Sequence, residues 1–220
     1  MKINYYISDR AGGVSAPPYA SLNIAYHVGD DPKAVERNRT ILAQKAGITK
    51  IQFASQVHGT EVRYIERLME PAPKCDGFVT DRPGIGLGIM SADCFGVLLY
   101  DPKGVIAAVH AGRAGATLGI VTEAIKKMHA LGAKRISAVI SPGIHRCCYE
   151  ISEDLAKTYD PKYLQGRHLD IKALLYDQLR AENVESITDF AICTACDRRY
   201  YSYRRDGQTG RFASIIWMEE

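Results

Sequence analysis

The stretch from Leu98 to Gly119 places the strongest constraint on how this chain can fold. Within it, Val105 to Val109 is wholly apolar and follows a Pro-Lys-Gly turn, which is typical of a strand buried on both faces. His110 ends that run, and Gly112 and Gly115 follow before helical periodicity begins. Glycine permits backbone that other residues resist, and the first turn of a helix presents unpaired N–H groups. This strand, histidine, glycine turn and helix therefore favour binding of an anion.

The remaining pattern predicts mixed β-sheets flanked by helices. Expected strands cover Ile51 to Ala54, Glu61 to Ile65, Phe78 to Thr80, Ile85 to Ile89, Val97 to Tyr100, Val105 to Val109, Ile136 to Ile140, Phe190 to Ile192, Tyr200 to Tyr203 and Ile215 to Trp217. Expected helices begin after Asp31, near Ala116, at Ser152 and near Asp170. Strands and helices do not alternate strictly, so a mixed α/β (α+β) fold is favoured over a doubly wound parallel sheet. With no linker or repeat, residues 1–220 are expected to form a single domain.

Charge and hydrophobicity exclude several classes of protein. The formal net charge is +3 and no long basic block occurs, so neither nucleic acid nor a membrane surface is an expected partner. No window approaches the roughly 20 apolar residues of a spanning helix, and the start resembles no signal peptide. We therefore expect a cytoplasmic location and interpret the six cysteines as thiols, metal ligands or core residues rather than disulfides.

Three residues beside expected strand ends are candidate zinc ligands and catalytic residues. They are His58, Cys94 and His110. Two neutral imidazoles and a thiolate suit a catalytic Zn²⁺ whose fourth position stays open for water or substrate. Their long spacing leaves two alternatives open. The histidines and the thiol can be ordinary core residues, or Cys94 can be a nucleophile with His110 as its base.

The other cysteines carry a weaker signal. Cys193 and Cys196 form a Cys-x-x-Cys pair, and a structural zinc needs a second pair. Cys147 and Cys148 are adjacent and lack the usual ligand spacing. Buried or bystander thiols are therefore the favoured interpretation.

Several charged residues have two readings each. Arg10 lies beside Gly12-Gly13 and is a candidate anion clamp. The arginines near the end of the chain form either a solvated face or an anion site, and the pattern does not choose among them; they are Arg198, Arg199, Arg204, Arg205 and Arg211. Asp93 either accepts the second proton of a ligand histidine or caps a strand end, and Asp76 is interpreted as a turn residue.

A series of motifs spread along nearly the whole chain resembles one known family. The motifs are Arg10-x-Gly12-Gly13-Val14-Ser15, Ser21-Leu22-Asn23, His27-Val28-Gly29-Asp30-Asp31-Pro32, Asn38-Arg39, Gln56-Val57-His58-Gly59, Asp76-Gly77, Ala92-Asp93-Cys94, Leu98-Leu99-Tyr100-Asp101-Pro102, Ala108-Val109-His110-Ala111-Gly112, Cys148-Tyr149-Glu150 and Ser202-Tyr203-Arg204-Arg205-Asp206-Gly207. The family is the YfiH-like or laccase-domain family, whose members are also labelled polyphenol oxidase, peptidoglycan editing factor and purine nucleoside phosphorylase.

This resemblance implies a fold, a cofactor and an activity. The implied fold is an α-β-β-α-like sandwich, and the implied zinc ligands are His58, Cys94 and His110. The implied reaction is phosphorolysis of adenosine, inosine, guanosine and methylthioadenosine, with deamination of adenosine alongside. Purine nucleosides and phosphate are thus the expected partners, in a monomer or homodimer. The copper-oxidase label has weak support because only six histidines are present.

One departure from the family lies in the glycine turn. Family members usually have Trp-Arg-Gly after His-Ala-Gly, whereas this chain has Arg113-Ala114-Gly115. Arg113 can replace the family arginine only in a rearranged turn. We expect phosphate near Gly112 to Gly115, with Arg10 as the clamp. Two rivals remain: a Cys94-His110 hydrolase acting on an amide or peptidoglycan precursor, and a binder of zinc or nucleoside without turnover.

Overall fold

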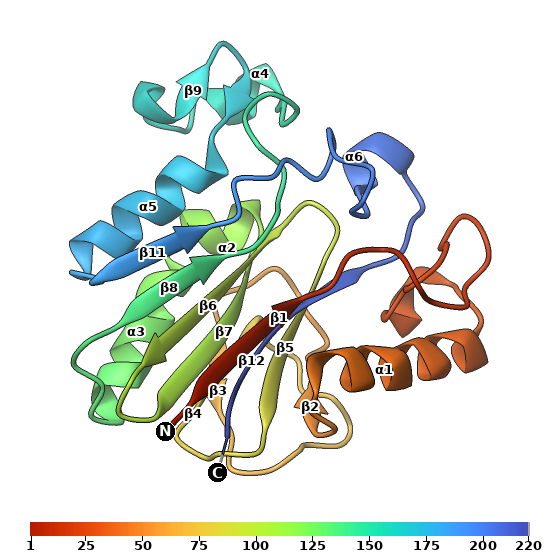
Figure 1. Ribbon diagram of the computed structural model, residues 1–220. Coiled ribbons are helices and arrows are strands. Elements are labelled where there is room, and N and C mark those ends of the chain that lie inside the picture. The colour runs from red at the N-terminus through yellow and green to blue at the C-terminus, as the bar shows by residue number, and fades with distance from the viewer. Residues whose placement is uncertain (220) are drawn as a thin grey trace.

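Two β-sheets packed face to face form the centre of the molecule (Figure 1). The structure, a computed structural model, describes residues 1–219. The six-stranded sheet has the order β11 (Ser186–Asp189), β8 (Ser137–Ile140), β6 (Phe95–Asp101), β7 (Val105–Ala111), β4 (Gly77–Thr80) and β3 (Val62–Tyr64). The four-stranded sheet has the order β1 (Ile3–Ile7), β12 (Phe212–Met218), β5 (Gly86–Ser91) and β2 (Ile51–Gln52). A small ribbon pairs β9 (Leu164–Gln165) with β10 (His168–Leu169).

Helices cover the outer faces of both sheets. The α-helices are α1 (Pro32–Ala46), α2 (Arg113–Thr117), α3 (Ile120–Ala130), α4 (Glu153–Ala156), α5 (Ile171–Ala181) and α6 (Tyr203–Asp206), and the 3₁₀ turns are η1 (Tyr26–Val28) and η2 (Pro161–Tyr163). In Figure 1, α3 and α5 lie on one side of the sheets and α1 lies on the other. No helix within residues 1–219 is both long and apolar enough to cross a membrane.

Successive side chains of the central strands point to opposite faces of the six-stranded sheet, and those on both faces are buried. On β6, Val97 and Leu99 belong to the core under α3 and α5, whereas Leu98 belongs to the core between the two sheets. On the far side, Leu42 of α1 packs in one cluster with Ile215 of β12. Burying such an aliphatic side chain stabilises the fold by about 1.5–3 kcal/mol. The four layers confirm the expected α-β-β-α sandwich of mixed sheets.

The sequence signals for α1 are confirmed in detail. The Asp31 carboxylate accepts a hydrogen bond from the Lys33 amide, and Pro32 occupies the first helical position. Gly47 ends the helix in the left-handed conformation, with φ of 76°. The strand expected at Val105 to Val109 is also confirmed, since every residue of β7 is buried.

Two expectations about strands were wrong, and one strand was not expected. The pattern does not predict β1, an edge strand that pairs with β12. The expected strand Phe190 to Ile192 is instead β11, because the Asp189 side chain accepts a hydrogen bond from the Ala191 amide and ends the strand there. The expected strand Tyr200 to Tyr203 is a loop leading into α6, because the Ser202 hydroxyl caps the Arg205 amide and starts a helix.

Candidate metal centre

The three candidate ligands meet at one end of the sandwich. Cys94 lies where the chain crosses from β5 of the four-stranded sheet to β6 of the six-stranded sheet. His110 lies near the end of β7, opposite Gly96 of β6, and His58 lies in the loop after β2. One ligand atom of each side chain lies within 4.8 Å of the other two. The fold thus brings together residues that are 16 to 52 positions apart in the sequence.

A buried carboxylate, Asp76, holds two of these ligands in place. Its Oδ1 lies 2.9 Å from His110 Nδ1, so that Nε2 is the ring nitrogen left to face a metal. The same carboxylate accepts hydrogen bonds from the amides of Val57, His58 and Gly59. Carboxylates that bind the second ring nitrogen of a ligand histidine fix its tautomer and direction. Sequence reasoning placed Asp76 in a turn and missed this role; the signal was an aspartate directly before a buried strand.

Asp93 does not serve the histidines. Its Oδ1 accepts a hydrogen bond from the Thr194 hydroxyl, and its Oδ2 accepts one from the Arg204 amide at 2.7 Å. Of the two interpretations that the sequence left open for Asp93, the one in which it takes the proton of a ligand histidine was therefore wrong. Asp93 instead ties the Cys94 turn to the loop after β11 and to α6, and these bonds hold its φ of 99°.

The electrostatics of the centre favour a thiolate. Burial raises the pKa of the Cys94 thiol, but the charge and hydrogen bonds of His110 and His58 outweigh burial and lower that pKa to about 6. Burial lowers the pKa of His110, but the Cys94 charge and the Asp76 hydrogen bond raise it to about 9. Cys94 is therefore ionised at neutral pH, which is the form that binds metal.

Gly112 is required by close packing rather than by its backbone conformation. Its φ is −73°, which other residues adopt readily. A Cβ there would lie 2.9 Å from the Cys94 Sγ and 3.1 Å from the His58 Cδ2. At Gly115, within α2, a Cβ would lie 2.9 Å from the Gly59 carbonyl oxygen. Both glycines therefore let the start of α2 approach the candidate ligands closely.

We expect Gly112→Ala to weaken metal binding by about tenfold or more, because the new methyl group displaces the Cys94 sulfur. Titration of the apoprotein with Zn²⁺ measures this. The control is Gly47→Ala, where a Cβ meets nothing within 4 Å. Its φ of 76° makes that change cost about 1 kcal/mol of stability without changing zinc affinity. Equal zinc affinity in Gly112→Ala and the wild type would contradict the packing argument.

The structure places Arg10 and Arg113 outside the cavity beside the ligands. The Arg10 guanidinium stacks on the Tyr201 ring, donates to the Ala20 carbonyl and lies 3.8 Å from the Asp206 carboxylate. Arg113 donates to the Tyr159 hydroxyl at 3.4 Å. Neither guanidinium is among the groups that line the cavity.

A cavity of about 470 Å³ opens beside the three ligands. Its lining residues come from widely separated parts of the chain and are His27, Gln56, His58, Met90, Ala92, Asp93, Cys94, His110, Ile144, Tyr149, Tyr203, Arg204 and Arg211. The structure thereby selects Arg204 and Arg211 from the arginine-rich end of the chain, which the sequence pattern could not do. Burial and the nearby arginines lower the pKa of His27, so this wall residue is neutral at pH 7.

The donor set of His58, Cys94 and His110 fits a catalytic zinc ion. Two imidazoles and a thiolate leave one tetrahedral position, and the ligands themselves line the cavity on that side. A cluster of several copper ions needs further imidazoles beside these, and within residues 1–219 the other histidines do not join this group. The residues present therefore suit a single metal ion.

Known proteins resemble this chain over nearly its whole length. Residues 4–219 match the family model described as multi-copper polyphenol oxidoreductase laccase. The chain is 40% identical to a Mycobacterium tuberculosis protein named purine nucleoside phosphorylase, over 100% of this chain and 93% of the relative. A Corynebacterium glutamicum protein of the same name is 42% identical, over 95% and 92%.

Two solved structures have the same fold as this chain. A Neisseria meningitidis protein superimposes with a TM-score of 0.90 at 33% identity, covering 99% of this chain and 95% of its own. YfiH of Bacillus licheniformis superimposes with a TM-score of 0.91 at 28% identity, covering 99% and 93%. The chain therefore belongs to the YfiH-like, laccase-domain family, in which its curated relatives carry the name purine nucleoside phosphorylase.

Proposed function

We propose that this protein is a zinc-dependent purine nucleoside phosphorylase that also deaminates adenosine. Adenosine, inosine, guanosine and methylthioadenosine are its proposed nucleosides. The observation that carries the proposal is one cavity lined both by the candidate metal ligands His58, Cys94 and His110 and by two arginines. The names of the relatives at 40% and 42% identity support it.

The size of the cavity suits a nucleoside. Small-molecule sites usually enclose about 300–1,000 Å³ and combine apolar walls with a few placed polar groups. Here Ile144 and Met90 supply apolar wall, and Tyr149 and Tyr203 supply aromatic surface for a purine. Neutral His27 offers one hydrogen-bond donor and one acceptor to the nucleoside.

Arg204 and Arg211 are the proposed phosphate ligands. Arg211 Nη1 donates to the carbonyls of Thr209 and Gly210, and Arg204 Nη1 donates to the carbonyls of Cys148 and Glu150. Each guanidinium is thus anchored through one nitrogen. Within residues 1–219, the Nε and Nη2 groups of both arginines donate to no protein acceptor, and both side chains line the cavity. Guanidinium groups bind phosphate through such paired donors.

In the proposed phosphorolysis, the two arginines hold phosphate for attack on the ribose C1′ carbon. The bond from C1′ to the purine breaks, and the products are the free base and the 1-phosphate of the sugar, which is ribose 1-phosphate when the substrate is inosine. In the proposed deamination, water replaces the amino group of adenosine and the products are inosine and ammonia. A zinc ion bound at the centre would supply Lewis acidity for these reactions. Asp76 keeps His110 oriented, and Gly112 keeps the start of α2 against the ligands.

The test is release of base from inosine with and without phosphate. We expect hypoxanthine and ribose 1-phosphate in phosphate buffer and neither product in phosphate-free buffer. Adenosine in phosphate-free buffer should still yield inosine and ammonia. Hypoxanthine release at the same rate without phosphate would contradict phosphorolysis.

Exchange of Arg211 for glutamine tests the phosphate site. We expect Arg211→Gln to raise the KM for phosphate by about 10- to 100-fold, since a charge-assisted hydrogen bond contributes about 1.5–3 kcal/mol. The KM for inosine should change far less. The matched control is Arg10→Gln, whose guanidinium lies outside the cavity. If Arg10→Gln raised the KM for phosphate more than Arg211→Gln did, then Arg10 rather than Arg211 would be the phosphate ligand.

A second candidate function is a cysteine hydrolase acting on an amide or peptidoglycan precursor. The low pKa of Cys94 and the high pKa of His110 are those of a thiolate–imidazolium pair. The position of His58 argues against this alternative. Its ring also lies beside the Cys94 sulfur, whereas a cysteine nucleophile needs only one base. A hydrolase would keep its activity after complete removal of zinc by a chelator.

A further inference from the structure

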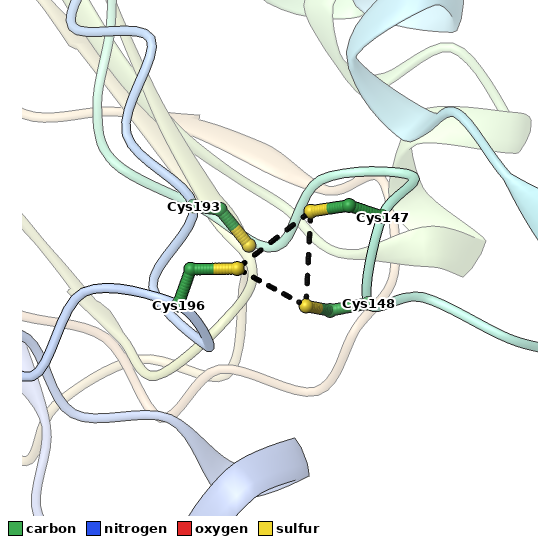
Figure 2. Close-up of side chains that lie close together, drawn as sticks. All are labelled: Cys147, Cys148, Cys193 and Cys196. Atoms are coloured by element: carbon green, nitrogen blue, oxygen red, sulfur yellow. Dashed lines mark hydrogen bonds between the residues drawn. The ribbon is translucent and has the colours of Figure 1, made fainter.

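Four cysteines form a second cluster, separate from the His58-Cys94-His110 centre. Cys147 and Cys148 come from the loop after β8, and Cys193 and Cys196 come from the loop after β11. Figure 2 shows the four sulfur atoms facing one another. All four lie within 4.8 Å of each other, and none is in a disulfide.

The sheet explains why these loops meet. β8 and β11 are adjacent and parallel, so their carboxyl ends lie at the same edge. Gly143 and Cys193 continue this pairing as an isolated bridge, in which the Thr194 amide donates to the Gly143 carbonyl at 3.0 Å. Two cysteine pairs that are 45 residues apart in the sequence are thereby fixed side by side.

The sulfur separations match a tetrahedral metal site. A Zn–S bond of about 2.3 Å gives about 3.8 Å between any two sulfurs of a regular tetrahedron. The observed separations are 3.7 Å for Cys147 and Cys148, 3.8 Å for Cys147 and Cys196, and 3.4 Å for Cys148 and Cys196. A disulfide requires about 2.05 Å, well below all three values.

The surroundings of the cluster suit a bound thiolate centre. The His145 amide donates to the Cys193 sulfur at 3.4 Å. Two consecutive arginines of α6 hold the loops: Arg204 Nη1 binds the Cys148 carbonyl, and Arg205 Nη1 binds the Thr194 carbonyl. Four thiolates around a divalent cation carry a net charge of about −2, and the two guanidinium groups that bind the same loops carry the opposite charge.

We propose that Cys147, Cys148, Cys193 and Cys196 bind one structural Zn²⁺ ion. Tetrahedral sites with four sulfur ligands are typical of structural zinc, and four protein ligands leave no position open for substrate. The ion ties together two loops, and the first of them carries the cavity residues Ile144 and Tyr149 on either side of its cysteine pair. It also fixes the Cys148 carbonyl that anchors Arg204. The second site thus stabilises one wall of the cavity without taking part in the reaction.

Metal content of the intact protein and of cysteine variants tests this assignment. We expect about two zinc ions per chain in the wild type, and about one both in Cys94→Ala and in the double variant Cys193→Ser/Cys196→Ser. Cys75→Ser is the matched control, since Cys75 is a free cysteine outside both clusters, and it should keep both ions. A single zinc ion in the wild type, lost entirely in Cys94→Ala, would overturn the proposal.

Two further measurements do not depend on the folding of the double variant. Cys94→Ala loaded with Co²⁺ should show the intense sulfur-to-cobalt absorption of four thiolates, and added Zn²⁺ should abolish it. All six thiols of the wild type should react with a thiol reagent after denaturation and chelation without reductant. Fewer than six reactive thiols, weak cobalt absorption, or iron in place of zinc would each contradict a structural zinc site.

Discussion

Replacing Cys94 with alanine is expected to remove one zinc ion per chain and to lower phosphorolysis of inosine by about three orders of magnitude. The change removes the sulfur ligand of the group, so that only two of the three ligand atoms remain, one from His58 and one from His110. A bound metal contributes several kcal/mol to stabilisation of charge in a transition state, and about 4 kcal/mol corresponds to a 10³-fold change in rate. Deamination of adenosine should fall in parallel. Metal analysis and steady-state kinetics on the same preparation measure both effects.

Chelation distinguishes the two roles available to Cys94. If its sulfur is a metal ligand, complete removal of zinc from the wild type should abolish activity, and added Zn²⁺ should restore it. The metal-free thiolate should then react with iodoacetamide at neutral pH, because its pKa is about 6, and bound zinc should protect it. Full activity in the metal-free wild type, lost on alkylation of Cys94, would instead establish the cysteine hydrolase. Cys75→Ala is the control for loss of a buried cysteine, since burial raises the pKa of that thiol to about 11.

The sequence predicted the three candidate metal ligands that converge in the structure, but it did not predict the residue that orients them. His58, Cys94 and His110 were found because imidazole and thiolate next to strand ends are typical ligands. Asp76 was interpreted as a turn because an Asp-Gly pair usually forms one, and its contact with His110 depends on the pairing of β4 with β7. A carboxylate that acts through strand pairing leaves no local signal.

The cluster of Cys147, Cys148, Cys193 and Cys196 could not be predicted either, because it also depends on strand pairing. Adjacent Cys147 and Cys148 lack the spacing of a ligand pair along a chain, so the pattern favoured bystander thiols. Their meeting with Cys193 depends on parallel pairing of β8 with β11, and β11 lies a few residues before the strand that the pattern predicted. The layered fold was easier to predict, because burial on both faces leaves continuous apolar runs such as Val105 to Val109.

The roles of the arginines near the end of the chain also depend on the fold. Composition makes them equivalent, whereas the structure directs Arg204 and Arg211 to the cavity and Arg205 to the Thr194 carbonyl. Because the sequence pattern predicted a strand at Tyr200 to Tyr203, it could not predict which arginines reach the cavity. Because the Ser202 hydroxyl starts a helical turn there, Arg204 and Arg205 point to different partners.

Asp76→Asn is expected to weaken zinc binding by about 10- to 100-fold and to lower stability by about 2–4 kcal/mol. Oδ1 of Asp76 accepts from the His58 amide and contacts His110 Nδ1, while Oδ2 accepts from the amides of Val57 and Gly59. In either orientation, the asparagine NH₂ group must face donors that the carboxylate accepted. The loss therefore falls on two ligand positions at once. Zinc titration and denaturant unfolding measure the two effects.

Asp101→Asn separates orientation of the ligands from simple loss of a buried carboxylate. Asp101 lies at the opposite end of β6 from Cys94 and accepts hydrogen bonds from the amides of Lys103, Lys134 and Arg135. Burial raises the pKa of each carboxyl, but the hydrogen bonds outweigh burial and lower both pKa values. Each carboxylate thus contributes stability that is complete above its unfolded pKa of about 4 and is lost as pH falls through its folded pKa. Both variants should therefore lose stability at pH 7 and show a smaller further loss in acid, yet only Asp76→Asn should lose zinc affinity. Equal zinc affinity in the two variants would show that Asp76 supports the fold without orienting the metal ligands.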